Sequence, residues 1–163
     1  MAITFQITGH KKSGKTLITT SLIKKLTLAG YSVAAIKHDA HHAAMDIPGT
    51  DSDRMSSAGA SQVILQSETG LFFHQEGHVP SLPAMVDFLG RTADFVLIEG
   101  HKEAIRYPKF LLLKPYEKPN EILTTQPIKT GTLFDNQYAE LVGQNEITAW
   151  CFNYLKQVKE KKQ

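Results

Sequence analysis

Cysteine, arginine and long apolar runs are scarce in this sequence of 163 residues. The one cysteine, Cys151, excludes an internal disulfide and fits a reducing, cytoplasmic compartment. The longest apolar runs, such as FLLL at residues 110–113, are far too short to span a bilayer. No basic segment precedes the apolar residues near the N-terminus, so no signal peptide is expected.

The sequence has no large excess of charge of one sign, since its 18 lysines and arginines nearly balance its 16 acidic residues. A net charge of +2 is too small to predict a nucleic-acid or membrane-surface partner. Only three of the cations are arginines: Arg54, Arg91 and Arg106. Small-molecule kinases usually clamp the transferred phosphoryl group with several arginines, so this scarcity argues against that class.

Hydrophobic residues make up 42% of the chain, which is ordinary for a soluble globular protein. The length predicts a single domain over residues 1–163. Residues 3–9 alternate apolar and polar side chains, which predicts a strand, and Ile18, Leu22 and Leu26 predict an amphipathic helix from Lys15 to Gly30. The nearly apolar segment YSVAAIKHD, residues 31–39, predicts a second strand, buried on both faces. This strand–helix–strand order predicts parallel pairing.

Further segments extend this pattern. Residues 51–60 predict a short helix capped by Asp51 or Ser52, and residues 62–75 predict a β-hairpin. Strands are expected in DFVLIEG, residues 94–100, and in PKFLLLKP, residues 108–115, with helices over residues 80–93 and at the C-terminus; residues 115–131 are not assigned. The predicted fold is an α/β P-loop NTPase: a mostly parallel sheet with helices on both faces and an added hairpin.

The stretch GHKKSGKT, residues 9–16, matches the P-loop pattern G-x-x-x-x-G-K-[ST] between a predicted strand and a predicted helix. The glycines allow backbone N–H groups to turn towards phosphate oxygens, and the helix directs the positive end of its dipole there. The lysine is expected to reach the β- and γ-phosphates, and the threonine hydroxyl to bind Mg²⁺. The predicted phosphate-binding residues are Gly9, His10, Lys11, Lys12, Ser13, Gly14, Lys15 and Thr16.

A P-loop also requires an acidic residue near the Mg²⁺, at the end of a buried strand. Glu99 follows four apolar residues and precedes Gly100, so Thr16 and Glu99 are the predicted metal-binding residues. Asp39 competes for this role, because it also ends a predicted buried strand. Lys15, Glu99 and Asp39 are therefore the catalytic candidates.

Histidines suggest a second possibility. His38, His41 and His42 are close enough in sequence for a metal site, but their spacing matches no zinc pattern, which favours surface or phosphate-facing roles. Asp51 and Arg54 form a polar pair that either lies near the phosphate site or serves as a helix cap with a solvated arginine.

The P-loop, KHDAHH, DIPGTDSDRMSSAGA, VLIEGHK and YPK occur in an order that resembles the molybdopterin-guanine dinucleotide biosynthesis adaptor family, MobB, over residues 3–109. The resemblance implies a GTP-binding adaptor with slow GTPase activity, usually a homodimer. Its implied partner is the molybdenum cofactor guanylyltransferase, which joins molybdopterin to GMP, and molybdopterin itself is a further candidate ligand. Matching positions imply that the nucleotide site also contains Lys37, His38, Asp51, Arg54, Glu99, Gly100 and Lys102.

The sequence departs from the family pattern at Leu17 and His101, and it contains no N-K-x-D motif for reading guanine. A preference for GTP over ATP therefore rests on the resemblance alone. The alternatives are a small-molecule P-loop kinase, a metal-insertion GTPase suggested by the histidines, and a nucleotide-sensing module without catalytic activity.

Overall fold

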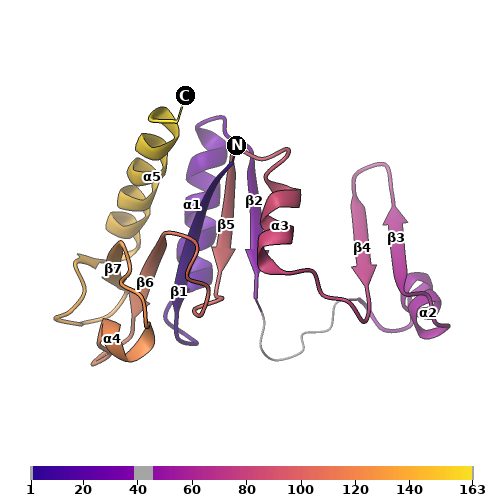
Figure 1. Ribbon diagram of the computed structural model, residues 1–163, viewed down its shortest axis with the longest axis horizontal. Helices are drawn as coiled ribbons and strands as arrows, with labels where there is room; N and C mark the ends of the chain where they lie inside the picture. Colours follow the sequence, from indigo (N-terminus) through magenta and orange to yellow (C-terminus); the bar gives the residue numbers. More distant parts are fainter. Residues whose placement is uncertain (1, 39–45, 163) are drawn as a thin grey trace. The chain divides into compact units, whose positions relative to one another are not determined.

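A computed structural model describes residues 2–38 and 46–162 of the chain. Asp39, His41 and His42 lie outside the described residues. The chain divides into two compact units, one formed by residues 1–38 and 85–163 and the other within residues 39–84. Figure 1 shows the helices and strands of each unit.

The first unit is built on a six-stranded sheet in the order β2-β5-β1-β6-β7-β8 within the described residues. Every pairing in this sheet is parallel. Residues 115–131, for which the sequence predicts no element, contain α4 and most of β7. The strands are β1 (Ile3–Gly9), β2 (Val33–Lys37), β5 (Phe95–Glu99), β6 (Lys109–Leu113), β7 (Lys129–Thr132) and β8 (Leu141–Val142).

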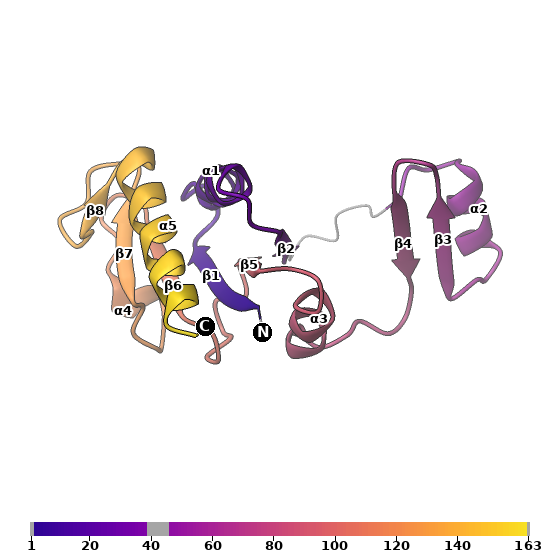
Figure 2. The same ribbon diagram turned by 90° about the horizontal axis from the view of Figure 1, so that it is seen from above.

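Helices cover both faces of this sheet, as predicted (Figure 2). On one face, α1 (Lys15–Leu28) and α5 (Gln144–Glu160) bury apolar side chains against alternate residues of β1, β5 and β6. On the other face, Ile122 of α4 (Pro119–Ile122) packs with Leu111 and Leu113 of β6. The helix α3 (Leu82–Leu89) buries Val86. The mostly parallel α/β architecture is therefore confirmed.

Burial differs among the strands because of their positions in the sheet. Every residue of β5 and β6 is buried, which explains their continuous apolar sequences. The prediction that the second strand is buried on both faces is wrong, since only Ile36 of β2 is buried. Among the strands of residues 2–38 and 46–162, β2 is the last in the order of the sheet and pairs with β5 alone.

The second unit contains the predicted hairpin and short helix. β3 (Gln62–Gln66) and β4 (Leu71–Gln75) pair antiparallel, with Ile64 opposite Phe73. The helix α2 (Asp51–Ser57) is capped by Thr50, whose side chain accepts a hydrogen bond from the N–H of Asp53. The prediction of Asp51 or Ser52 as the cap is therefore wrong by one or two residues.

Asp94, directly before β5, connects three parts of the first unit. Its carboxylate accepts a hydrogen bond from the ammonium of Lys159 in α5 at 2.6 Å. It also accepts hydrogen bonds from the backbone N–H and the hydroxyl of Ser32, at 2.8 and 2.9 Å. Lys159 is the main cause that lowers the pKa of Asp94 to about 2, and the bonds from Ser32 add to it.

Because the pKa of Asp94 is lowered on folding, its carboxylate stabilises the fold above the unfolded pKa of about 3.9. This stabilisation is lost as the pH falls from about 4 towards 2. We expect Asp94→Asn to reduce the free energy of unfolding by about 1 kcal/mol near neutral pH, because solvent screens this partly exposed pair. Urea unfolding at neutral pH and at acid pH measures the effect. A difference between the two proteins that does not shrink in acid would contradict it.

Candidate phosphate-binding site

The loop between β1 and α1 requires glycine at both ends. Gly9 has a φ of 147°, and a Cβ there would lie 2.4 Å from the carbonyl oxygen of Leu112. Gly14 has a φ of 94°, and a Cβ there would lie 2.2 Å from Cδ1 of Leu133. At Gly9 the backbone conformation and the fixed carbonyl both exclude a side chain, and at Gly14 the left-handed backbone conformation favours glycine.

The inside of this loop offers donors rather than acceptors. The backbone N–H of Ser13 donates to the carbonyl of His10 at 3.2 Å, which closes the turn. Within the described part of the chain, no protein acceptor is found for the backbone N–H groups of Gly14, Lys15 and Thr16. These donors lie at the start of the 14-residue helix α1, where the helix dipole is positive. The arrangement is suited to an anion.

Lys15 folds back over the loop, and its ammonium donates to the carbonyl oxygen of His10 at 2.8 Å. Burial is the main effect and lowers the pKa of Lys15, while the nearby Glu99 raises it and Lys37 lowers it further. Lys11 and Lys12 are exposed. Lys15 thus differs from the two neighbouring lysines in being held at the loop.

Glu99 lies beside the loop because of the register of the parallel strands. At the end of β5 it is level with Ile7 of β1 and with Lys37 of β2. Its side chain is buried, and Oε1 accepts a hydrogen bond from the Thr16 hydroxyl at 2.9 Å. Nζ of Lys37 lies 4.0 Å from the same oxygen. The structure therefore brings together three residues that the sequence singled out, Thr16, Lys37 and Glu99, from three different elements.

The oxygen atoms of Thr16 and Glu99 fit Mg²⁺, which prefers hydroxyl, carboxylate and water oxygens and is often bound with few protein ligands. No group of three or more histidine, cysteine, aspartate or glutamate side chains could hold a metal ion within residues 2–38 and 46–162. A cation at this position would thus depend on these two side chains together with phosphate oxygens and water.

The turn after β5 places His101 beside His38, which directly follows β2. The rings of His38 and His101 lie 4.2 Å apart between centroids. Burial is the main cause that lowers the pKa of His101, and the proximity of His38 lowers it further. The side chain of Gln6 holds this turn by donating to the carbonyls of Gly100 and His101 at 2.7 and 2.6 Å. Lys102 lies nearby along the chain, half-exposed, with Nζ 3.9 Å from Glu103.

A contact not predicted from the sequence joins the loop to the segment that follows β6. Nδ1 of His10 and Oε1 of Glu117 lie 2.7 Å apart. Burial favours the neutral form of Glu117, but the backbone N–H of Lys114, together with His10, outweighs it and lowers the pKa of Glu117. Asn136, buried after β7, donates to the carbonyls of Lys114 and Glu117 at 2.7 and 2.9 Å. No local sequence signal marks these residues.

Two other predicted residues belong to the second unit. Asp51 and Arg54 form an exposed ion pair at 3.5 Å on α2. Their role in the phosphate site stays a prediction. The same holds for Asp39, which lies outside the described residues.

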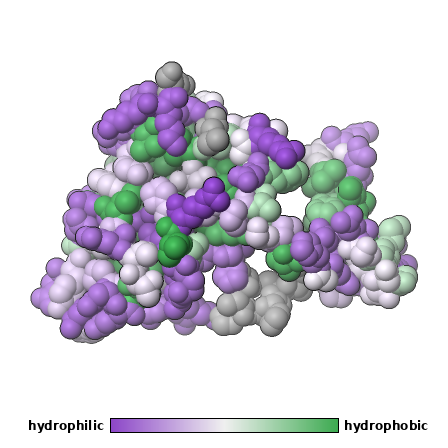
Figure 3. Space-filling view, viewed as in Figure 1, coloured by the Kyte–Doolittle hydropathy of each residue, from purple (hydrophilic) through white to green (hydrophobic). Residues whose placement is uncertain are grey.

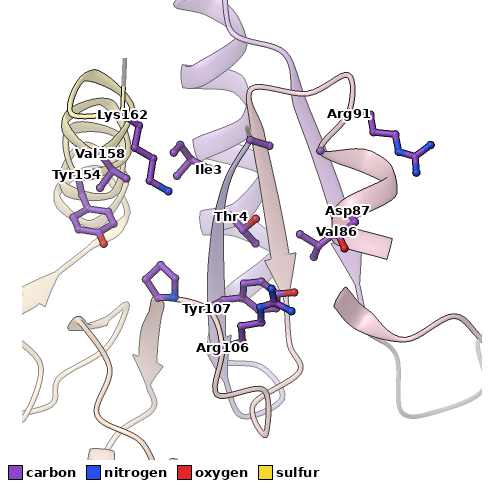
Figure 4. Close-up of a pocket in the computed structure, with 13 residues that line it drawn as sticks. Ile3, Thr4, Val86, Asp87, Arg91, Arg106, Tyr107, Tyr154, Val158 and Lys162 are labelled. Carbon is purple, nitrogen blue, oxygen red and sulfur yellow. The ribbon is translucent and has the colours of Figure 1, made fainter. Parts of the chain in front are cut away.

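A cavity of about 440 Å³ lies near the amino-terminal end of β1, opposite the end that leads into the loop (Figure 4). Arg91 and Arg106 line it together with Ile3, Thr4 and Tyr154. It contains none of the predicted phosphate-binding residues. Two of the three arginines of the chain are therefore placed away from the loop, which weakens the kinase alternative further.

Residues 4–130 match a protein-family model described as MobB, molybdopterin guanine dinucleotide synthesis protein B. This match extends beyond residue 109, where the resemblance in the sequence ends. No helix in the described ranges is both long and apolar enough to cross a membrane.

Relatives with curated names support the same family. The chain is 41% identical over 108 residues to the molybdopterin-guanine dinucleotide biosynthesis adapter protein of Haemophilus influenzae, covering 65% of this chain and 60% of that protein. It is 34% identical over 113 residues to the putative adapter protein of Methanocaldococcus jannaschii, covering 66% of this chain and 46% of that protein. The matched segment of this chain thus spans 60% of the length of the first relative and 46% of the length of the second.

Solved structures show the same fold over more of the chain. The MobB protein of Bacillus subtilis superimposes with a TM-score of 0.75 at 20% identity, covering 95% of this chain and 96% of that one. The MobB homologue of Bacillus stearothermophilus has a TM-score of 0.72 at 19% identity, covering 94% and 98%. At these identities the likeness establishes the fold.

Proposed function

The chain belongs to the family of molybdopterin guanine dinucleotide synthesis protein B, and on this premise we propose that it is a GTP-binding adaptor in molybdenum cofactor biosynthesis. In this role it binds GTP with Mg²⁺ in the cytoplasm and hydrolyses it slowly. It assists the guanylyltransferase that attaches GMP to molybdopterin. Molybdopterin is a further candidate ligand.

One observation carries the nucleotide part of this proposal. The backbone N–H groups of Gly14, Lys15 and Thr16 have no acceptor among the described residues, and the Lys15 ammonium and the pair Thr16–Glu99 lie beside them. A triphosphate supplies the acceptors that such a loop lacks, and its charge complements the lysine and the helix dipole. When bound, Mg²⁺ would neutralise phosphate charge, with Thr16 and Glu99 as its protein ligands.

Binding of fluorescent GTP and ATP analogues in the presence and absence of Mg²⁺ tests the nucleotide part. The adaptor part is tested by co-purification of the tagged chain with a molybdenum cofactor guanylyltransferase. We expect GTP to bind more tightly with Mg²⁺, and the transferase to be retained. Failure to bind any triphosphate would contradict the proposal.

Self-association is part of the proposed function, and the hairpin is its candidate surface. Ile64, Leu71 and Phe73 are exposed and lie on one face of β3 and β4, because Ile64 and Phe73 are directly paired. Figure 3 shows apolar side chains gathered over this hairpin. Exposed apolar surface of this kind is typical of an interface, and a twofold pairing would cover it.

We expect the chain to sediment as a dimer at micromolar concentration and Ile64→Lys to shift it to a monomer. A lysine on this face would place two like charges in a twofold interface. Glu68→Lys, at the tip of the same hairpin, adds the same side chain away from this face and serves as the control. A wild-type protein that sediments as a clean monomer would contradict the prediction.

A further inference from the structure

A second cavity, of about 340 Å³, lies beyond the carboxyl ends of β6 and β7. Two loops form it, one following β6 and the other following β7. The phosphate-binding loop follows β1 at this same edge of the sheet. The residues that line the cavity are Tyr116, Lys118, Asp135, Asn136, Gln137 and Tyr138.

Both loops that line this cavity also contact the phosphate-binding loop. Glu117 lies between two lining residues in sequence and contacts His10 at 2.7 Å. Leu133, two residues before Asp135, lies against Gly14. In the sheet, β7 is two strands from β1, which is about 10 Å at the usual spacing between strands. A nucleotide with its phosphates in the loop can reach the cavity with its base.

Asn136 and Asp135, both in the wall of the cavity, differ in their hydrogen bonding within the protein. The amide N–H groups of Asn136 donate to two carbonyls, and its Oδ1 accepts a hydrogen bond from the N–H of Tyr138 at 2.8 Å. Asn136 is therefore a positioning residue that fixes both loops. In the described part of the chain, the Asp135 carboxylate takes part in no hydrogen bond or ion pair within the protein.

A carboxylate only accepts hydrogen bonds, so it selects a base that presents two adjacent donors. Guanine does so through N1–H and the N2 amino group. Adenine presents an acceptor beside its amino group, and so does cytosine, while the N–H of uracil lies between two carbonyl oxygens. Resting on the proposed nucleotide binding, we propose that this cavity receives the guanine base and that Asp135 reads it.

The remaining lining residues suit the other parts of a purine. Lys118 and Gln137 carry donors that complement the O6 and N7 acceptors of guanine. Tyr116 and Tyr138 offer aromatic faces on which a base can stack. Tyr116 is 93% exposed, so the face of its ring is free to contact a base.

The test exchanges the hydrogen-bonding pattern of the base and of the side chain together. Xanthosine triphosphate carries a carbonyl oxygen in place of the guanine amino group, and Asp135→Asn introduces an amide donor opposite it. We expect this variant to bind GTP about tenfold or more weakly than the wild type, and xanthosine triphosphate more tightly. Inorganic tripolyphosphate, which has no base, should bind both proteins equally. Asp87→Asn, an exposed aspartate of α3 that does not line this cavity, should change none of these affinities.

Several results would overturn the inference while leaving nucleotide binding intact. Equal affinity of the wild type for GTP and ATP would show that no guanine is read. A variant that keeps its preference for GTP over xanthosine triphosphate would show that Asp135 does not read the base. Equal loss of GTP and tripolyphosphate would assign Asp135 to the phosphate site. A wild-type protein that binds neither GTP nor tripolyphosphate would refute the proposed function and this inference together.

Discussion

Replacing Lys15 with alanine is expected to weaken the binding of a non-hydrolysable GTP analogue by about a hundredfold. The ammonium of Lys15 is held at the loop by the carbonyl of His10 and is partly buried. A charge-assisted hydrogen bond contributes about 1.5–3 kcal/mol, and at a partly buried position solvent screens it less than on the surface. The loss should therefore far exceed the effect of removing a surface charge.

Lys11→Ala is the matched control, because it removes the same charge from an exposed position in the same loop. Exposed charges contribute about 0–1 kcal/mol, so the control should lose less than about fivefold. Titration of the wild type, Lys15→Ala, Lys11→Ala and Lys12→Ala with the analogue in Mg²⁺ measures these losses. Equal losses at all three lysines would indicate a diffuse basic surface rather than a specific phosphate site.

Glu99→Gln is expected to abolish most of the proposed slow GTPase activity while GTP still binds. The substitution keeps the shape of the side chain and removes the charge that faces Thr16 and Lys37. Loss of one preorganised electrostatic group costs about 2–4 kcal/mol of transition-state stabilisation, or about 30- to 1000-fold in rate. The dependence of the rate on Mg²⁺ should also weaken, because Glu99 is a proposed ligand. Binding through Gly14, Lys15 and the helix dipole should remain.

Single-turnover hydrolysis of GTP at several Mg²⁺ concentrations measures this effect, and analogue binding is followed in parallel. Asp39→Asn is the comparison variant, because Asp39 is the other acidic candidate. Loss of hydrolysis in Asp39→Asn with intact hydrolysis in Glu99→Gln would reverse the assignment. Unchanged hydrolysis in both variants would indicate an adaptor in which neither carboxylate is catalytic.

Much of the first unit follows from local sequence patterns. Alternation in residues 3–9 and four-residue spacing in residues 15–28 are signals within one element, so β1 and α1 were predicted correctly. The loop between them was predicted because a tight turn between a strand and a helix requires glycines at a fixed spacing. The sequence does not predict the edge position of β2, because an apolar segment gives no sign of whether one strand or two will pair with it.

The sequence by itself determined which residues form the candidate phosphate-binding loop and the class of fold, because both depend on residues that are close along the chain. Only the tertiary structure placed Glu99 level with Lys37, through the pairing of β5 with β2. It also brought Glu117 to His10, which is 107 positions away in sequence. The cavity beside Asp135 likewise depends on two loops that only the order of the strands brings together. Contacts over such separations have no local periodicity, and they form because parallel strands with buried faces align their carboxyl ends at one edge of the sheet.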